Sequence, residues 1–208
     1  MRVHLIVAHP EEKSFNCALH KVAKQTFSEF GAIVTESNLY AEQFDAVAGT
    51  KDVIGFSDPS GFNLAKAQRY ALDNGAFCEQ IKYEQQNLIA CDLLILQFPL
   101  WWWSFPAILK GWIDRVLTSG FAYGQEAILK PRKVMYSITT GGAANQDEKA
   151  YYQGKIDGLY QDVFGFMGWK IVPPFIAHGV QRKSHKARQL ILQDYQSHLK
   201  TNLFNSHK

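Results

Sequence analysis

Three consecutive tryptophans, Trp101, Trp102 and Trp103, stand in the segment PLWWWSFP. Neighbouring side chains on a strand face opposite ways and those on a helix lie about 100° apart, so three indoles in a row cannot all enter one core. At least one of them should line a surface, a cleft or a partner. Aromatic stacking on a flat ring contributes roughly 0.5–1.5 kcal/mol beyond area burial. The run therefore predicts an aromatic wall for a planar ligand, with core packing of one or two indoles as the alternative.

Two other stretches carry polar groups that could bind the rest of such a ligand. In AHPEEKSFN, Ser14 and Asn16 stand at the start of a predicted helix, whose free backbone N–H groups can hold a phosphate without a lysine. In TTGGAAN, Thr139 and Thr140 offer hydroxyls, and the two glycines let backbone amides approach a ligand closely. A plain helix cap and an ordinary strand-to-loop turn are the respective alternatives.

Short, continuously apolar runs predict the strands that must position these loops. Such runs suit strands buried on both faces, and the segments between them have helix-like patterns. The predicted strands cover 3–8, 32–40, 93–98, 134–138 and 170–176. They indicate an α/β protein with a doubly wound parallel sheet, in which ligands bind beyond the carboxyl ends of the strands. Because the three loops follow the first, third and fourth strands, we expect them to be neighbours in space.

The intervening helices have recognisable starts. Ser14 or Asn16 can cap a helix over 15–29. Pro106 suits the first turn of a helix PAILKGWIDRVL, because its missing N–H is harmless there. A last helix is predicted over 184–199.

Composition bounds the class of protein. The 208 residues, 47% of them hydrophobic, suffice for one globular domain over 1–208. A formal net charge of +3 without a long basic run favours neither nucleic-acid nor membrane-surface binding. Cys17, Cys78 and Cys91 are scattered, which favours reduced thiols and a cytoplasmic location, and no stretch has the roughly 18 apolar residues of a membrane span. The long excursion over 40–90 predicts a task or a partner of its own.

Hydrogen-bond donors for a phosphate, a polar amide edge and an aromatic wall together match a nucleotide-like ligand with a large planar ring. A flavin has those parts. The motifs GxGxxG, GxxxxGK[ST], HExxH and GxSxG are missing from the sequence. It therefore carries no signature of nucleoside triphosphate chemistry, zinc-dependent hydrolysis or an α/β-hydrolase nucleophile.

Several longer motifs add a resemblance to a known family. LIVAHPEEKSFNCAL, SNLYAEQFDAV, QFPLWWWSFPAILKGWIDRV, GFAY and SITTGG occur in this order over 3–142, and GWKIVPPFIAHGV is a weaker echo. In these motifs the chain resembles the flavodoxin-like, DT-diaphorase-like NAD(P)H:quinone oxidoreductases, in a short form without their C-terminal extension. The resemblance implies a flavodoxin-like sheet of five parallel strands in the order 2-1-3-4-5, with helices on both faces.

The resemblance also implies the residues of the site. Contacts to the cofactor are implied for His9, Ser14, Phe15, Asn16, Ala18, Pro99, Leu100, Trp101, Trp102, Trp103, Thr139, Thr140, Gly141 and Gly142. Contacts to the substrate are implied for Trp103 and Tyr123. Tyr123 is implied to reach the partner subunit's site in a homodimer, and covering the sheet end is its alternative role. Asn63 stands where relatives have a glutamine that touches the cofactor across the dimer.

The proton relay is where the chain departs from the family. Relatives with the long excursion carry a Tyr followed six residues later by a His. Here AYYQGKIDG offers Tyr151 or Tyr152 but no such His. Asp157, or Lys155, is the predicted substitute.

The implied activity is two-electron NAD(P)H:quinone oxidoreduction, with hydride passing from NAD(P)H to flavin N5 and then to a quinone in a ping-pong cycle. The resemblance to family members with a long excursion implies FAD, and FMN is the alternative cofactor. An azo- or nitro-reductase, or a regulatory or electron-carrier flavoprotein, is the alternative function. Electron carriers are usually strongly acidic, which this chain is not.

Overall fold

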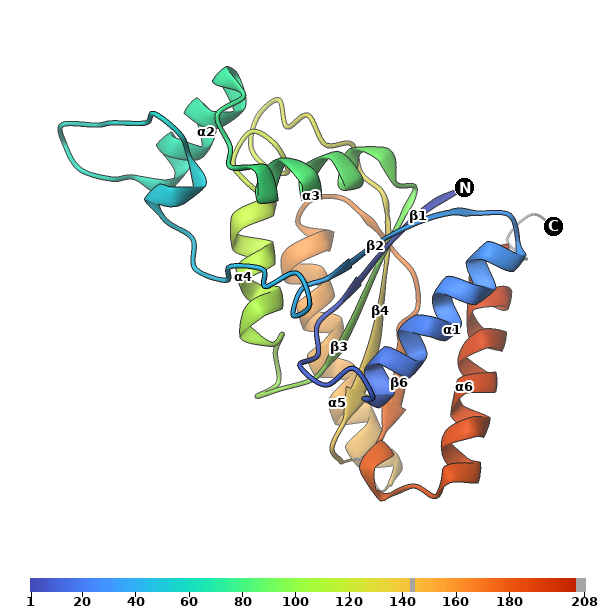
Figure 1. Ribbon diagram of the computed structural model, residues 1–208. Helices are drawn as coiled ribbons and strands as arrows, with labels where there is room; N and C mark the ends of the chain where they lie inside the picture. Colours follow the sequence, from blue (N-terminus) through green and yellow to red (C-terminus); the bar gives the residue numbers. More distant parts are fainter. Residues whose placement is uncertain (143–144, 205–208) are drawn as a thin grey trace.

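The computed structural model describes residues 1–142 and 145–204 of the chain. Its centre is a parallel sheet in the order β2-β1-β3-β4-β5, with β6 also paired to β4 (Figure 1). This order confirms the prediction. The strands are β1 (Arg2–Val7), β2 (Ile33–Asn38), β3 (Leu93–Pro99), β4 (Lys133–Thr140), β5 (Lys170–Ile171) and β6 (Phe175–His178).

The last predicted strand differs from the prediction, because the segment 170–176 is split into β5 and β6. Two prolines lie between the pieces, and proline has no N–H with which to continue a ladder. Val134 pairs with Ile171, whereas Ser137 pairs with Phe175. The step between these pairs is three residues along β4 but four residues from β5 to β6. The extra residue is a bulge. The sheet therefore has six strands rather than five, and the ends of β6 and β4 lie opposite each other.

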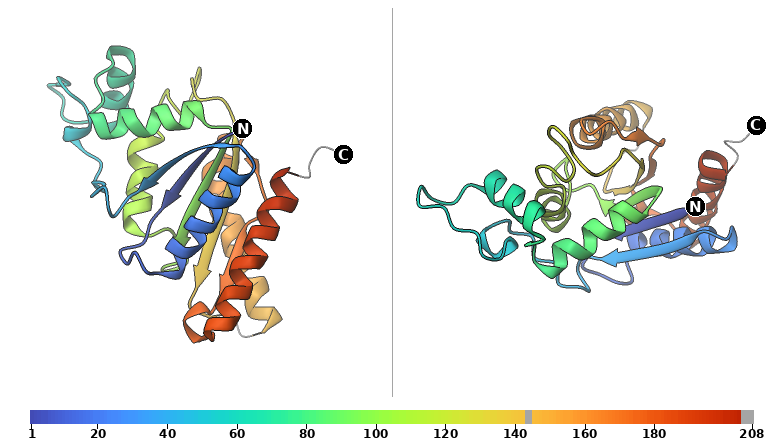
Figure 2. Two further views of the ribbon diagram at one scale, coloured as in Figure 1. Left: turned by 45° about the vertical axis from the view of Figure 1, so that its right-hand side comes forward. Right: turned by 90° about the horizontal axis from the view of Figure 1, so that it is seen from above.

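Helices cover both faces of the sheet, as predicted (Figure 2). α1 and α6 pack on one face, and α3, α4 and α5 pack on the other. Along β3, Leu93 and Ile95 enter the first core and Leu94 and Leu96 enter the second, which explains the continuous apolar run. The helices are α1 (Phe15–Glu29), α2 (Leu64–Asn74), α3 (Glu79–Ala90), α4 (Ala107–Val116), α5 (Gln146–Tyr160) and α6 (His185–Leu199).

Side-chain caps set the starts of α1 and α6. Ser14, not Asn16, caps α1, because the Ser14 hydroxyl accepts a hydrogen bond from Cys17 N at 3.2 Å. Ser184 caps α6 in the same way, through Ala187 N at 3.2 Å. A free hydroxyl oxygen at this position satisfies one of the N–H groups that a helix start leaves open.

The excursion after β2 runs past α4 and carries α2, which projects beyond α3 and α4 (Figure 1). α4 holds its base. The buried Arg115 donates to Asp52 at 2.7 Å and to Gln80 Oε1 at 2.7 Å. The backbone of Ala46 packs so closely on Gly111 that a Cβ at this glycine would overlap it.

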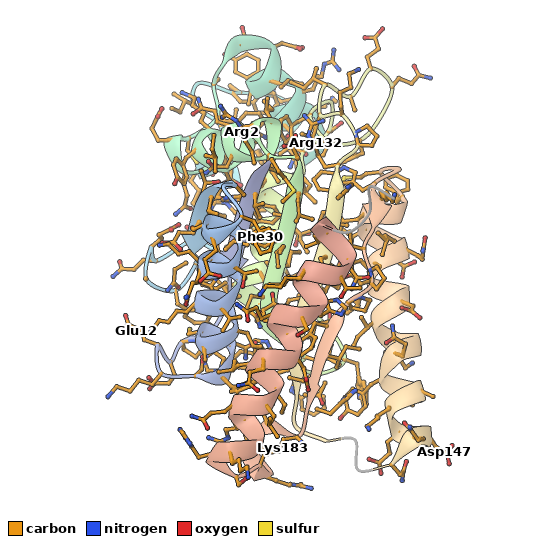
Figure 3. All side chains as sticks on the ribbon, turned by 90° about the vertical axis from the view of Figure 1, so that its right-hand side faces the viewer. Arg2, Glu12, Phe30, Arg132, Asp147 and Lys183 are labelled. Carbon is orange, nitrogen blue, oxygen red and sulfur yellow. The ribbon has the colours of Figure 1, made fainter. Side chains whose placement is uncertain are left out.

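The carboxyl ends of the strands lie together at one end of the molecule. Figure 3 shows Asp147 and Lys183 at this end and Arg2 and Arg132 at the opposite one. Within residues 1–142 and 145–204, no helix is both long and apolar enough to cross a membrane.

Candidate functional site

The three loops that follow β1, β3 and β4 meet, as predicted. Leu100 N donates to Thr139 O at 2.9 Å, which joins two of them. Together they surround a cavity of about 410 Å³, which we call the cradle. The cradle is lined by His9, Ser14, Phe15, Asn16, Pro99, Leu100, Trp101, Thr139, Thr140, Gly141, Val180, Gln181 and Arg188. The TTGGAAN loop also contains residues 143–144, which lie outside the described residues.

The start of α1 gives the cradle an anion-binding end. The helix's own hydrogen bonds begin with Ala18 N, which donates to Ser14 O at 3.0 Å. The amides of Phe15 and Asn16 precede this bond, so helix geometry leaves them for a ligand. The first turn contains no acidic residue, and Arg188 adds a positive charge to the same cavity.

Arg188 was missed by the sequence reasoning. Its Nε donates to Val180 O at 2.9 Å and its Nη2 to Gln181 O at 3.2 Å, which packs the turn after β6 onto the start of α6. A guanidinium has five N–H donors, so these two bonds leave others for a ligand. The available signal was an arginine at the start of the predicted helix over 184–199. Sequence spacing does not reveal that this helix start lies beside the loop after β1.

Asn16 is a buried bridge as well as a lining residue. Its Nδ2 donates to Thr139 Oγ1 at 2.8 Å, and its Oδ1 accepts from Gln97 Nε2 at 2.8 Å. All three side chains are buried. The Asn16 amide therefore ties the start of α1 to the ends of β3 and β4.

The tryptophan run forms a tight turn. Trp101 and Ser104 exchange two backbone hydrogen bonds, of 3.2 and 3.0 Å, so Trp102 and Trp103 are the central residues. Both have positive φ angles, 49° and 60°, at positions where glycine and asparagine are usual. The three tryptophans are 40%, 96% and 42% exposed in chain order. The alternative of core packing is therefore wrong for all three.

A second cavity, of about 460 Å³, adjoins the cradle, because its residues Trp103 and Gly142 belong to the same two loops. We call it the aromatic pocket. The ring centroid of Trp103 lies 4.9 Å from that of Tyr151 and 4.8 Å from that of Tyr152. These rings offer faces and edges to a flat ligand. The other lining residues are Asp147 and Glu148.

One histidine contacts a lining residue of each cavity, although it lines neither cavity itself. His178 ends β6, and its Nδ1 is 3.1 Å from Thr140 Oγ1 in the cradle. Its ring centroid is 5.5 Å from that of Tyr152 in the aromatic pocket. Burial lowers the pKa of His178 below the usual 6.5, and the charges of Lys149 and Lys183 lower it further. The imidazole is therefore mostly neutral at neutral pH.

Four of the predicted cofactor and relay residues are not among the lining residues of either cavity: Ala18, Trp102, Lys155 and Asp157. Trp102 is almost fully exposed on its turn, and Ala18 is half-buried within α1. Asp157 lies further along α5, where its Oδ1 accepts from Gln153 Nε2 at 2.7 Å.

Two of the predicted residues have local contacts. The Nζ of Lys155 lies 5.4 Å from the ring centroid of Tyr151, so Lys155 borders the aromatic pocket. Asn63 is the N-cap of α2, and its Oδ1 accepts from Lys66 N at 3.0 Å. The side-chain oxygen of Asn63 is thus already used within its own helix.

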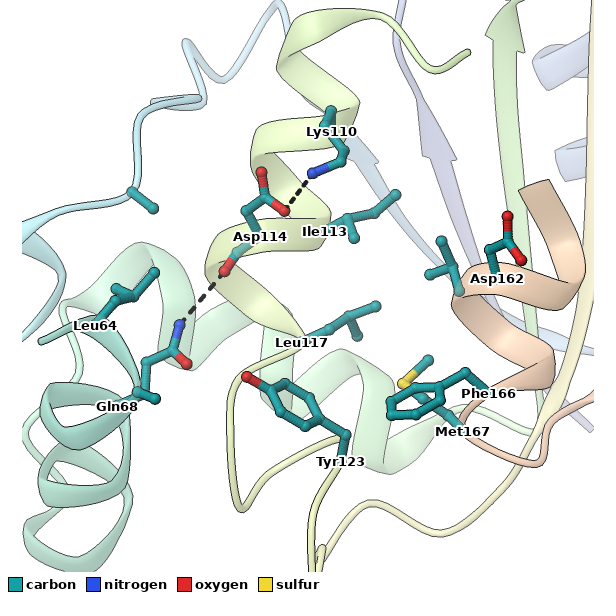
Figure 4. Close-up of a pocket in the computed structure, with 13 residues that line it drawn as sticks. Leu64, Gln68, Lys110, Ile113, Asp114, Leu117, Tyr123, Asp162, Phe166 and Met167 are labelled. Carbon is teal, nitrogen blue, oxygen red and sulfur yellow. Dashed lines mark hydrogen bonds and ion pairs between the residues drawn. The ribbon is translucent and has the colours of Figure 1, made fainter. Parts of the chain in front are cut away.

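Tyr123 lines a third cavity, of about 510 Å³, on the face covered by α4 (Figure 4). Apolar side chains dominate its lining, including Ile113 of α4, Leu117 directly after α4, and Phe166 and Met167 after α5. The ring of Tyr123 lies 6.3 Å from that of Phe166, which is 72% exposed. Tyr123 is not part of the cradle or the aromatic pocket of its own chain.

Comparisons with known proteins agree with this geometry. A family model described as flavodoxin-like fold matches residues 1–200. The chain is 37% identical over 210 residues to the ribosyldihydronicotinamide dehydrogenase (quinone) of Rattus norvegicus, covering 96% of this chain and 91% of that one. It is 31% identical over 210 residues to NAD(P)H dehydrogenase (quinone) 1 of the same species, covering 96% and 77%.

A solved structure extends the likeness. It is that of a candidate quinone reductase from Klebsiella pneumoniae, and it matches with a TM-score of 0.88 at 30% identity, over 97% of this chain and 84% of that one. The sequence motifs, the order of the sheet and the meeting of the three loops all agree with these comparisons. The chain belongs to the flavodoxin-like family of NAD(P)H:quinone oxidoreductases.

Proposed function

We propose that the protein is a flavin-dependent NAD(P)H:quinone oxidoreductase that transfers two electrons as hydride in a ping-pong cycle. One observation carries the proposal: a cradle with an anion-binding end lies directly beside a pocket walled by Trp103, Tyr151 and Tyr152. The names of the two rat relatives support the reaction class.

The residues of the cradle fit a flavin. A Cβ at Gly141 would stand in open space, with nothing within 4 Å, so this glycine leaves room for a ring edge at its backbone. The start of α1 and Arg188 match a phosphate group. The rings of His9 and Trp101, 6.2 Å apart, provide an aromatic surface. When bound, a flavin would supply the hydride chemistry itself.

The protein's own residues would bind and align the flavin and the substrate, and would stabilise the charge that develops on the ring. The backbone amides of Gly141 and Gly142 would meet negative charge at the edge of the ring, much as an oxyanion hole does. Trp103 and the two tyrosines beside it would stack on a nicotinamide or a quinone and exclude water from it. Since an azo or nitro compound could stack in the same way, an azo- or nitro-reductase is the competing proposal.

We propose FAD as the cofactor, with FMN as the alternative. The support is the long excursion, which the resemblance associates with FAD and which Arg115 holds in place. We also propose one functional domain over 1–208 in a homodimer. The apolar third cavity and the exposed rings of Phe166 and Tyr123 support a partner surface there. Scattered, unpaired cysteines support a reducing, cytoplasmic compartment.

Two experiments test the proposal. Mass spectrometry of the compound released from the purified protein should identify FAD. Anaerobic mixing with NADH, NADPH or dihydronicotinamide riboside should then remove the visible absorbance of the oxidised flavin, and a quinone should restore it. Failure of all three donors would contradict the proposed function. Restoration by an azo dye in preference to a quinone would favour the competing proposal.

A further inference from the structure

We propose that His178, which contacts Thr140 of the cradle and Tyr152 of the aromatic pocket, supplies the proton that quinone reduction requires. This inference rests on the proposed function and deepens it. It assigns to a residue of β6 the task for which the sequence suggested Asp157 or Lys155.

The hydrogen bonds around Thr140 fix the tautomer of His178. Thr140 Oγ1 donates to Gly142 O at 2.9 Å, and a hydroxyl has only one proton. The same oxygen lies 3.1 Å from His178 Nδ1 and can therefore only accept a hydrogen bond from it. Nδ1 must carry a hydrogen, and in the neutral imidazole the free lone pair is then on Nε2.

The fold brings His178 to this point through the bulge between β5 and β6. The bulge sets His178 opposite Thr140 at the ends of their strands. The next residue, Gly179, packs on the same loop, since a Cβ added at this glycine would lie 3.7 Å from Gly142 O. His178 is half-buried, held on one side by Thr140 and on the other by the ring of Tyr152.

The charges around His178 favour release of a proton. Lys149 and Tyr152 face it from α5, and Lys183 faces it from the turn after β6. Burial is the main cause that lowers the pKa of His178, and the charges of both lysines lower it further. A protonated His178 would therefore give up its proton more readily than a free histidine, and general acid catalysis depends on such a group close to the reacting atom.

The stoichiometry of the reaction requires a second proton, which such a group can deliver. Reduction of a quinone to a hydroquinone adds two electrons and two protons. The hydride from NAD(P)H brings both electrons and one proton, and NAD(P)⁺ is left behind. The second proton goes to the other quinone oxygen. His178 Nε2 would take this proton from water, pass it to that oxygen and return to the neutral form.

Two substitutions separate the ionisation of His178 from its contacts. His178→Gln keeps an N–H donor for Thr140, and His178→Phe keeps a ring beside Tyr152. For the native protein, kcat/KM for quinone should rise as pH falls and level off through an inflection below pH 6.5. Both variants should lose the inflection and about 100-fold in kcat/KM on the acid side. His198→Gln is the matched control and should keep the native profile.

A measurement without turnover provides a second readout. Imidazole ¹⁵N NMR of the purified protein should find His178 protonated on Nδ1, with a pKa below 6.5. His198 should show the opposite tautomer, because its Nε2 donates to Pro173 O at 2.9 Å.

The outcomes are distinguishable. An Nε2–H tautomer at His178, or a His178→Gln variant with the native rate and profile, overturns this inference and leaves the proposed function standing. Loss of rate in His178→Phe alone also overturns it, because the role would then be the bond to Thr140. A native protein that reduces no quinone with any of the three donors overturns the proposed function and this inference together.

Discussion

At Trp102 and Trp103 the backbone adopts a conformation that ordinarily selects glycine or asparagine. Two bulky residues with positive φ angles form the centre of one turn, and each such residue costs about 1–2 kcal/mol. At Trp103 the strained conformation serves a site, since the Trp103 ring forms the aromatic pocket with the rings of Tyr151 and Tyr152. Trp102 has the same strained backbone, but its side chain is 96% exposed and no ring contact is described for it.

Trp102→Asn should therefore stabilise the protein. Asparagine tolerates a positive φ, so the free energy of unfolding should rise by about 1 kcal/mol and Tm by about 2–4 °C. Thermal unfolding monitored by circular dichroism measures this. Trp102→Ala is the control: it removes the indole but keeps the strained backbone, and should change stability by less than about 0.5 kcal/mol. Equal destabilisation by both variants would show that the indole makes stabilising contacts in solution.

Asn16 is predicted to matter for stability and for cofactor binding together. Asn16→Ala leaves Thr139 and Gln97 buried without their partner, which should cost about 1–3 kcal/mol in urea unfolding. The same variant should release the proposed flavin more readily on dialysis, because the start of α1 is no longer tied to β4. Ser14→Ala, which removes only the helix cap, should cost about 0.5–2 kcal/mol. Native stability of Asn16→Ala would contradict the bridging role.

At the scale of elements, α4 joins the excursion to the sheet. Arg115 and Asp52 form an ion pair in which each side chain is 3% exposed, and Gly111 lets the chain at Ala46 pass directly against the helix. The excursion, identified from its length alone, is thus fixed at its base by a helix that follows β3. This helix also follows the tryptophan turn, so the same element supports the aromatic wall and the excursion.

Arg115→Met should unfold the protein at a lower urea concentration. The substitution leaves the carboxylate of Asp52 buried without its partner, a situation that costs about 3–5 kcal/mol. Lys110→Met provides a matched control in the same helix. Its pair with Asp114 is about half exposed, so the loss should be no more than about 1 kcal/mol. Similar losses in the two variants would argue against a structural role for the buried pair.

At the scale of the whole molecule, several histidines couple stability to pH. Burial is the main cause of a lowered pKa at His9, His20, His178 and His198. Their usual value is 6.5, so between this value and the lower folded values the unfolded chain binds more protons than the native protein. Stability from these groups is therefore full above about pH 6.5 and is lost as pH falls through the folded pKa values.

Calorimetry should accordingly find a lower Tm at about pH 5.5 than at about pH 7.5. His178→Gln and His198→Gln should each flatten part of this dependence, because glutamine does not titrate. A Tm that rises on acidification over the same range would contradict the assignment to buried histidines.

Much of the fold was determined by local sequence. Continuous apolar runs predicted β1, β3 and β4, Ser14 or Asn16 predicted the start of α1, and the order of the sheet followed from the family motifs. The split of the last strand was not predicted, although two prolines mark it in the sequence. A hydrophobic pattern records which side chains are buried, whereas the bulge depends on hydrogen bonds to another strand.

The sequence by itself determined that the loops after β1, β3 and β4 would meet, because parallel strands present all their carboxyl ends at one edge of the sheet. Only the tertiary structure decided that Arg188 joins the cradle, and that His178 lies beside Thr140 and Tyr152. These residues come from β6 and α6, far along the chain from the motifs. Their positions depend on strand register and helix packing, which are long-range contacts that spacing within a single sequence does not encode.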